Sequence, residues 1–166
     1  MSDKTFTLSS NDLGGTFTHE QVMNNFGCSG GNISPHLQWE NAPEGTKSFA
    51  ITMHDPDAPT DSGFWHWAVF NIPVNVTELK AGAGNPDKDL LPKGAFMGRA
   101  DTGQNAYGGP CPPEDDFVHK YIITVYALKT EKPELDQDTP LAQAVYQIVM
   151  QHEITRASLI AYYKRD

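Results

Sequence analysis

The sequence predicts a mainly β fold, and three observations lead to this prediction. Glycine (14 residues) and proline (12 residues) are scattered in small groups between short apolar runs. Such spacing is typical of many short strands joined by loops. Several runs alternate apolar and polar residues with the two-residue period of a strand. No repeat, low-complexity tract or linker divides the chain, so residues 1–166 are expected to form a single domain.

Composition and charge exclude some classes of binding partner. The net charge is -9, and the chain has no lysine or arginine cluster of the kind that nucleic-acid binding requires. The same acidity argues against adhesion to anionic membranes. No apolar run approaches the length of a bilayer span, and the N-terminus lacks the apolar stretch of a secretory signal. A cytoplasmic protein without a membrane span is therefore expected.

The expected strands follow from the alternation of side chains. Residues 48–54 place Phe49, Ile51 and Met53 on one face. Residues 119–128 predict a central strand, because the stretch 120–128 is apolar on both faces. Residues 41–46 predict a turn, and glycine and proline exclude regular structure across residues 82–86 and 108–113. The remaining expected strands are residues 6–8, 37–39, 66–72 and, at the C-terminal end, 157–165.

A helix is expected near the C-terminus. Asp138 or Thr139 would cap it, Pro140 would take its first position, and it would end near residue 151 or 152. Its apolar stripe consists of Leu141, Val145, Ile148 and Val149. A second, short helix is predicted over residues 18–24, with Thr18 as its cap.

The first candidate site is the loop Asp55-Pro56-Asp57-Ala58-Pro59. Its two prolines must end the preceding strand, and they stiffen a loop that holds two carboxylates in a fixed direction. The simpler interpretation is a turn in which Asp55 or Asp57 accepts backbone N–H groups. The loop alone favours this simpler interpretation.

Two histidines begin expected strands. In Trp65-His66-Trp67, alternation predicts that His66 points away from both tryptophans, although a lone histidine at a core edge is the commoner case. His119 and Tyr121 are expected to share one strand face.

The loop before His119 is rich in glycine and proline. Gly108, Gly109, Pro110, Cys111, Pro112 and Pro113 could present backbone N–H groups to an anion, or could form an ordinary surface loop. Imidazole, tyrosyl and backbone donors together suit a phosphate or carboxylate group. The sequence therefore predicts a small-anion pocket.

The two cysteines are Cys28 and Cys111, and no CxxC pair indicates zinc binding. Two free thiols and one long-range disulfide are both compatible with the sequence. Free thiols are favoured for a cytoplasmic protein.

The residues 32–73, NISPHLQWENAPEGTKSFAITMHDPDAPTDSGFWHWAVFNIP, and 107–128, YGGPCPPEDDFVHKYIITVYAL, resemble the phosphatidylethanolamine-binding protein (PEBP) family. The similarity is closest to its bacterial and archaeal Raf kinase inhibitor-like branch (YbhB/YbcL type). The resemblance implies an antiparallel β-sandwich with a few peripheral helices and a pocket for phosphate-like anions, including phospholipid headgroups and phosphorylated side chains. The ligand-binding residues it implies are Asp55, Asp57, His66, Gly109, Pro110, Cys111, Pro112, His119 and Tyr121.

One segment departs from the family pattern. Glu114-Asp115-Asp116-Phe117 stands where the family usually has a lysine and glycines. Three acids beside an anion pocket are expected to weaken its attraction to phosphate groups.

The expected function is a binding module that holds a small phosphate-like or carboxylate anion and modulates a protein partner such as a kinase or protease. The alternative is a hydrolase in which Asp55, His66 and His119 act as acid and base. Metal binding by His54, Asp55, Asp57 and His66 is a third possibility without diagnostic spacing, so neither metal nor cofactor is expected. Exposed aromatics near Trp65, Tyr162 and Tyr163 would permit a homodimer.

Overall fold

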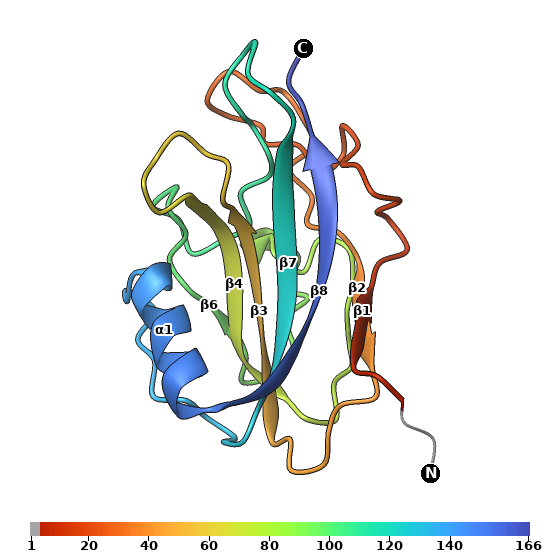
Figure 1. Ribbon diagram of the computed structural model, residues 1–166, viewed down its shortest axis with the longest axis vertical. Coiled ribbons are helices and arrows are strands. Elements are labelled where there is room, and N and C mark those ends of the chain that lie inside the picture. The colour runs from red at the N-terminus through yellow and green to blue at the C-terminus, as the bar shows by residue number, and fades with distance from the viewer. Residues whose placement is uncertain (1–3) are drawn as a thin grey trace.

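The computed structural model describes residues 4–166 and contains two antiparallel sheets (Figure 1). The smaller sheet has the order β1-β2-β5, and the larger has the order β6-β4-β3-β7-β8. The strands are β1 (Thr7–Ser9), β2 (Leu37–Glu40), β3 (Ser48–Asp55), β4 (Phe64–Pro73), β5 (Glu78–Leu79), β6 (Phe96–Met97), β7 (His119–Leu128) and β8 (Glu153–Tyr163). The predicted mainly β fold is confirmed.

The main core lies between the two sheets. Leu37 and Trp39 of the smaller sheet join one buried cluster with Phe49, Ile51 and Trp67 of the larger sheet. These side chains are at most 1% exposed, so they contribute most of the hydrophobic stabilisation that holds the sheets together.

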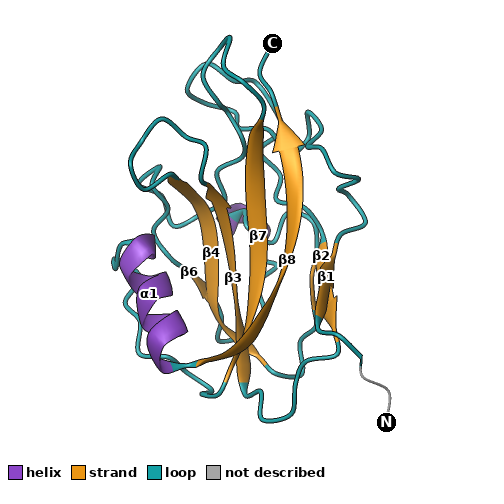
Figure 2. Cartoon of the chain, in the orientation of Figure 1, coloured by secondary structure: helices purple, strands orange, loops and turns teal. Residues whose placement is uncertain are grey.

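One helix, α1 (Leu141–Gln151), covers the other face of the larger sheet near β4 and β6 (Figure 2). Its buried residues are Leu141, Ala144 and Ile148, and Val145 and Val149 pack partly buried against the same cluster. The predicted apolar stripe is thus confirmed. The predicted cap is wrong, because Pro140 occupies the N-cap position and no side chain caps the helix.

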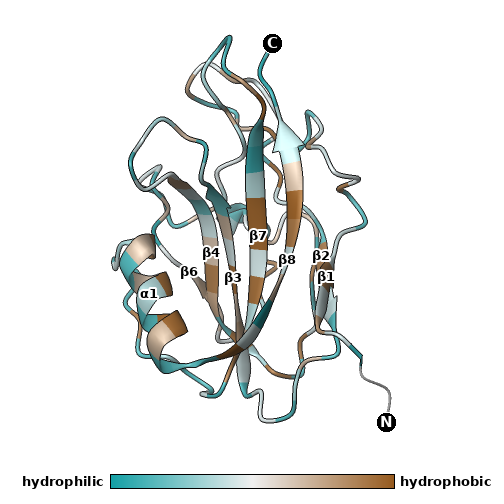
Figure 3. Cartoon of the chain, in the orientation of Figure 1, coloured by the Kyte–Doolittle hydropathy of each residue, from teal (hydrophilic) through white to brown (hydrophobic). Residues whose placement is uncertain are grey.

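Strand β7 lies between β3 and β8. The last six of its residues, 123–128, are all buried. Hydrophobic residues gather along its middle, whereas its first residues are hydrophilic (Figure 3). The prediction of a central strand is confirmed. The hydrophilic beginning of β7 is the part that carries the candidate site.

Three expectations about local structure were wrong. Residues 18–24 form turns and bends and no helix. Their backbone groups bond to distant segments instead of along a helix: Met23 N–H donates to the Pro110 carbonyl at 3.1 Å, and the Val22 carbonyl accepts from Asn32 N–H at 2.8 Å. The terminal strand starts at Glu153, four residues earlier than expected, immediately after α1. A short 3₁₀ turn, η1 (Pro86–Lys88), also begins within a segment expected to lack regular structure.

Within residues 4–166, no helix is long and apolar enough to cross a bilayer. The single α-helix has 11 residues, about half of what a span requires.

Candidate functional site

A cavity of about 480 Å³ opens where three strands of the larger sheet end or begin. Strand β3 ends at Asp55, β4 begins at Phe64 and β7 begins at His119, and β3 pairs with both neighbours. Antiparallel pairing therefore brings residues from distant parts of the chain to one edge of the sheet. The cavity is lined by Met23, Phe26, Asp55, Ala58, Pro59, Thr60, Phe64, His66, Asp101, Cys111, Pro112, Pro113, His119, Tyr121 and Arg165.

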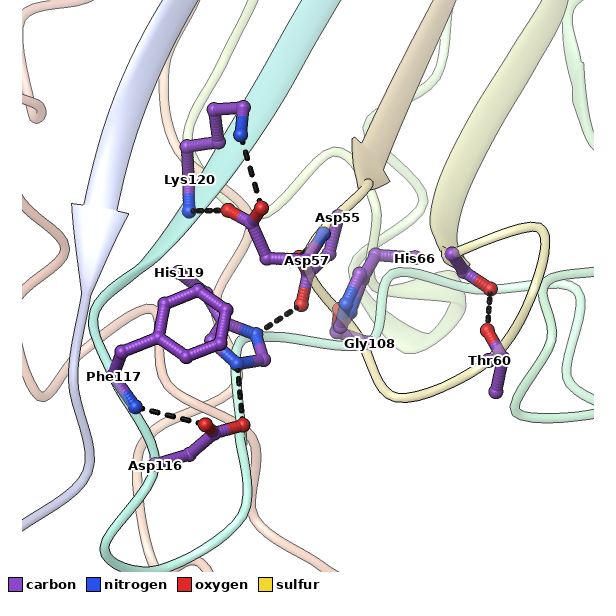
Figure 4. Close-up of polar contacts among 10 residues, drawn as sticks. Asp55, Asp57, Thr60, His66, Gly108, Asp116, Phe117, His119 and Lys120 are labelled. Atoms are coloured by element: carbon purple, nitrogen blue, oxygen red, sulfur yellow. Dashed lines mark hydrogen bonds and ion pairs between the residues drawn. The ribbon is translucent and has the colours of Figure 1, made fainter.

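His119 lies between two carboxylates (Figure 4). Its Nδ1 is 2.7 Å from Oδ2 of Asp55, and its Nε2 is 2.9 Å from Oδ2 of Asp116. The His119 side chain is fully buried, and Asp55 is 4% exposed, whereas Asp116 is 27% exposed. Both ring nitrogens are thus engaged, and each can donate only if the ring carries two protons.

The pKa of His119 reflects two opposing effects. Burial alone lowers it, but the hydrogen bonds and negative charges of Asp55 and Asp116 outweigh burial and raise the pKa above its ordinary value. The hydrogen bond to His119 lowers the pKa of Asp116. The two carboxylates therefore favour the imidazolium form of His119, and in that form the ionised cluster carries one net negative charge.

His66 is buried and stays neutral. Burial lowers its pKa from 6.5 to about 4, despite the opposing effect of the Gly108 carbonyl. Nδ1 of His66 lies 2.8 Å from that carbonyl oxygen, to which it must donate. The remaining nitrogen, Nε2, is consequently the hydrogen-bond acceptor that His66 offers to a ligand.

A β-bulge sets the direction of His66. Met53 lies opposite Trp67 and His54 lies opposite Trp65, so His66 has no partner across the strand pair. The ring of His66 is 5.3 Å from that of Tyr121. Trp67 belongs to the core between the sheets, while Trp65 packs on the side of the helix. His66 therefore points to the same side as Trp67, and the prediction that it faces away from both tryptophans is wrong.

Tyr121 is fully buried on the cavity wall, and its hydroxyl has no hydrogen-bond partner in residues 4–166. Burial, followed by the negative charge of Asp55, raises the pKa of Tyr121 far above its ordinary value. The hydroxyl therefore keeps its proton at every physiological pH. Tyr121 and His119 lie on the same side of β7, with ring centroids 6.4 Å apart, as their alternation predicted.

Asp57 lies outside the cavity lining and has a structural partner. Its carboxylate accepts hydrogen bonds from the backbone N–H and the Nζ of Lys120, both at 2.9 Å. Its own N–H donates to Asp55 Oδ1 at 2.8 Å. The loop thus also forms the simple turn that the sequence allowed, and this turn fixes the Asp55 carboxylate for His119.

The glycine-rich loop uses its N–H groups inside the protein. Gly108 N–H donates to the His66 carbonyl at 3.0 Å, and Gly109 N–H donates to Asn32 Oδ1 at 2.8 Å. These two N–H groups therefore do not face the cavity, whereas ligand binding by the rest of the loop stays a prediction. A side chain at Gly109 would clash with the Gln21 carbonyl, which explains the glycine. Cys111 and Pro112 line the cavity, and Gly109 and Pro110 do not.

Cys28 and Cys111 form a disulfide, with their Cα atoms 6.1 Å apart. The expectation of free thiols is therefore wrong. The bond joins two loops that lie side by side at the cavity end of the molecule (Figure 1). It holds Phe26 and Cys111, two parts of the cavity wall, in a fixed relation.

Sequence reasoning missed Arg165 and most of the apolar wall, which includes Met23, Phe26 and Phe64. Arg165 Nη2 donates to the Gly27 carbonyl at 3.0 Å and to Glu114 Oε1 at 3.1 Å. The position of Arg165 beside the cavity could have been predicted from the pairing of the last two long strands. Because β8 pairs antiparallel with β7, the residues after Tyr163 must lie beside those before His119.

No group of three His, Cys, Asp or Glu side chains within residues 4–166 is arranged to hold a metal ion. His54, one candidate ligand, stacks on Trp65 with ring centroids 4.1 Å apart, and its Nε2 contacts the Ser62 carbonyl. The four candidate ligands thus do not converge.

The fold and the cavity define a class of protein: a β-sandwich with a cavity at one end of its larger sheet. Residues 13–164 match the model of the family described as phosphatidylethanolamine-binding protein, and the chain belongs to this family. The predicted resemblance is confirmed.

The chain is similar to curated proteins and to solved structures. It is 50% identical to the UPF0098 protein YbcL of Escherichia coli over 145 residues, covering 86% of this chain and 79% of that protein. The identity to YbhB of the same organism is 41%, covering 94% and 98%. The crystal structure of E. coli YbcL, titled a new member of the mammalian PEBP family, superposes with a TM-score of 0.94 at 45% identity, covering 98% and 100%. A Chlamydia trachomatis homologue, CT736, has a TM-score of 0.78 at 27% identity, covering 98% and 99%.

Proposed function

We propose that this protein binds a small phosphate-like anion, of the kind that phospholipid headgroups and phosphorylated side chains carry, in the cavity beside His119. The observation that carries the proposal is the Tyr121 hydroxyl, a buried donor on the cavity wall without a partner in residues 4–166. Leaving such a donor unpaired costs about 1–3 kcal/mol, which an oxygen of the ligand would recover.

The other polar groups of the wall fit a phosphate that carries one proton. Tyr121 donates to one oxygen, and neutral His66 accepts from the P–OH through Nε2. His119 supplies the positive charge. The apolar wall around Phe26, Pro59 and Phe64 would contact whatever group the phosphate is attached to.

The hydrolase alternative has less support from the geometry. Both nitrogens of His119 are engaged by carboxylates, so it has no free lone pair to act as a base. The sulfur of Cys111 is part of a disulfide and is no nucleophile. A screen of generic phosphatase, esterase and peptidase substrates separates the two functions, since turnover that Asp55→Asn abolishes while the variant remains folded by circular dichroism would establish the enzyme.

Titration calorimetry with inorganic phosphate and phosphoethanolamine at pH 5.5 and pH 7.5 tests the binding proposal. We expect binding at both values and tighter binding at the lower one, because more of the phosphate then carries the proton that neutral His66 accepts, and more of His119 is protonated. Absence of heat at both values would refute the proposal. Modulation of a kinase or protease partner, and a homodimer, stay predictions that this titration does not address.

The compartment is a separate part of the proposal. A cytoplasmic location was expected, but the Cys28–Cys111 disulfide favours an oxidising compartment. Labelling of intact cells with a thiol-reactive maleimide, before and after reduction, would decide between them.

A further inference from the structure

We propose that Asp116, which lies just outside the cavity lining, is the specificity-determining residue of the pocket: its carboxylate occupies Nε2 of His119, the ring nitrogen that Asp55 leaves free, so that phosphate groups can displace it and simple carboxylates cannot. This inference rests on the proposed anion-binding function. It follows from the two bonds of His119, whose ring lies on the cavity wall while Asp55 and Asp116 hold both of its nitrogens.

The two carboxylates are held differently. Asp55 ends β3, is buried, and accepts a hydrogen bond from the Asp57 N–H. Asp116 lies in a turn before β7, is more exposed, and is held locally only by the Phe117 N–H and a long backbone contact to Pro113 (Figure 4). The neighbouring Asp115 has a positive φ of 61°. Asp116 is therefore the partner of His119 that can move away while Asp55 stays.

The charges around His119 require an incoming anion to replace Asp116 and not to bind beside it. An anion added beside Asp55 and Asp116 would place a third negative charge around one imidazolium, whereas an anion that replaces Asp116 keeps the count at two. The two other charged residues of the lining, Arg165 and Asp101, have opposite signs and leave this count unchanged. The ligand thus has to compete with a carboxylate that the chain itself holds in place. A tethered group has an effective concentration in the millimolar range or higher.

This competition separates the anion classes. A free carboxylate would accept the same hydrogen bond from His119 as Asp116 does. Because Asp116 is attached to the chain beside His119 and the free carboxylate is not, Asp116 outcompetes it. A phosphate carries additional oxygens that reach Tyr121 and a P–OH that reaches His66, whose rings lie 5.3 Å apart. These extra bonds are available only to a group with three or more oxygens. Phosphate can therefore displace Asp116, and acetate cannot.

The test compares inorganic phosphate and acetate binding to the parent, Asp116→Ala and Asp115→Asn by titration calorimetry. Asp115→Asn is the matched control, because it removes the same charge from the same turn, asparagine tolerates a positive φ, and Asp115 has no hydrogen bond or ion pair in residues 4–166. We expect Asp116→Ala to bind phosphate about tenfold more tightly than the parent and to gain acetate binding. Asp115→Asn should change affinity by less than about twofold, because its exposed charge is screened.

The outcomes distinguish the inference from the proposed function. Equal effects of the two variants, or a parent that binds acetate as well as phosphate, would overturn the inference and leave anion binding intact. If neither the parent nor a variant binds either anion, both fail. A readout independent of the folding of Asp116→Ala is the side-chain carboxyl NMR signal of Asp116 in the parent. Phosphate is expected to shift this signal more than that of Asp115, and bound phosphate that leaves it unchanged would overturn the inference.

Discussion

Nδ1 of His119 lies 2.7 Å from Oδ2 of Asp55, and the two side chains join the beginning of β7 to the end of β3 across 64 positions of sequence. Both are almost completely buried. A charged pair withdrawn from water is held only as long as each partner compensates the other. The pair is therefore expected to stabilise the folded state as well as to form part of the pocket.

Replacing Asp55 by asparagine should destabilise the protein. The change leaves a buried imidazole without its main counter-charge, which in comparable pairs costs about 3–5 kcal/mol. Because the pKa of His119 is raised in the folded state, the pair's contribution is complete below about pH 6.5 and is lost as pH rises through the folded pKa. Urea unfolding at pH 6 and pH 9 measures this. The control Glu114→Gln, which removes an exposed partner of Arg165, should cost less than about 1 kcal/mol.

His66 should make the protein acid-sensitive. Its folded pKa of about 4 lies below the ordinary 6.5, so the unfolded chain takes up a proton between these values before the folded protein does. The free energy of unfolding should therefore be complete above about pH 6.5 and fall by about 3 kcal/mol as pH drops towards 4. His119 does not oppose this trend, since its contribution is already complete below about pH 6.5.

His66→Gln provides the comparison for this acid effect. Glutamine cannot take up a proton, so the stability of the variant should depend less on pH between 6.5 and 4. Unfolding curves in urea at half-unit intervals of pH would show it. Identical slopes for parent and variant would mean that His66 does not titrate as described.

Tyr121→Phe should separate binding from stability. The hydroxyl has no partner in residues 4–166, so its removal should leave the melting temperature unchanged or slightly raised. Phosphate affinity should fall by about tenfold, because one donor hydrogen bond is lost. Calorimetric titration and thermal unfolding of the same samples test both effects. A stability loss with unaltered phosphate binding would assign Tyr121 to the core alone.

Reduction of the Cys28–Cys111 disulfide should lower stability by about 2–5 kcal/mol, because the bond closes a loop with a sequence separation of 83. Thermal unfolding with and without a reductant measures the effect, and the double variant Cys28→Ser, Cys111→Ser serves as control. The reductant should have no effect on this variant. Since both loops border the cavity, phosphate affinity should also weaken on reduction.

The sequence alone predicted six of the eight strands within residues 4–166, all except the two-residue strands β5 and β6, and the face that His119 and Tyr121 share. Side chains in a strand alternate with a period of two, so the spacing of residues fixes these features locally. Apolar residues on both sides likewise identified β7 as central, because a strand flanked by packed layers needs no polar face. The four-residue error at the start of β8 arose where residues 153–156, three polar residues around Ile154, hide a strand that its pairing with β7 stabilises.

Only the tertiary structure decided the chemistry of the pocket. The direction of His66 depends on a bulge, which exists only in the register between β3 and β4. The inward N–H groups of Gly108 and Gly109 depend on acceptors that distant segments supply. The same holds for the disulfide, for Arg165 on the cavity wall and for the contact of Asp116 with His119. Local patterns specify which way a side chain points along its own strand, whereas the partner it meets is set by how separate segments pack against one another.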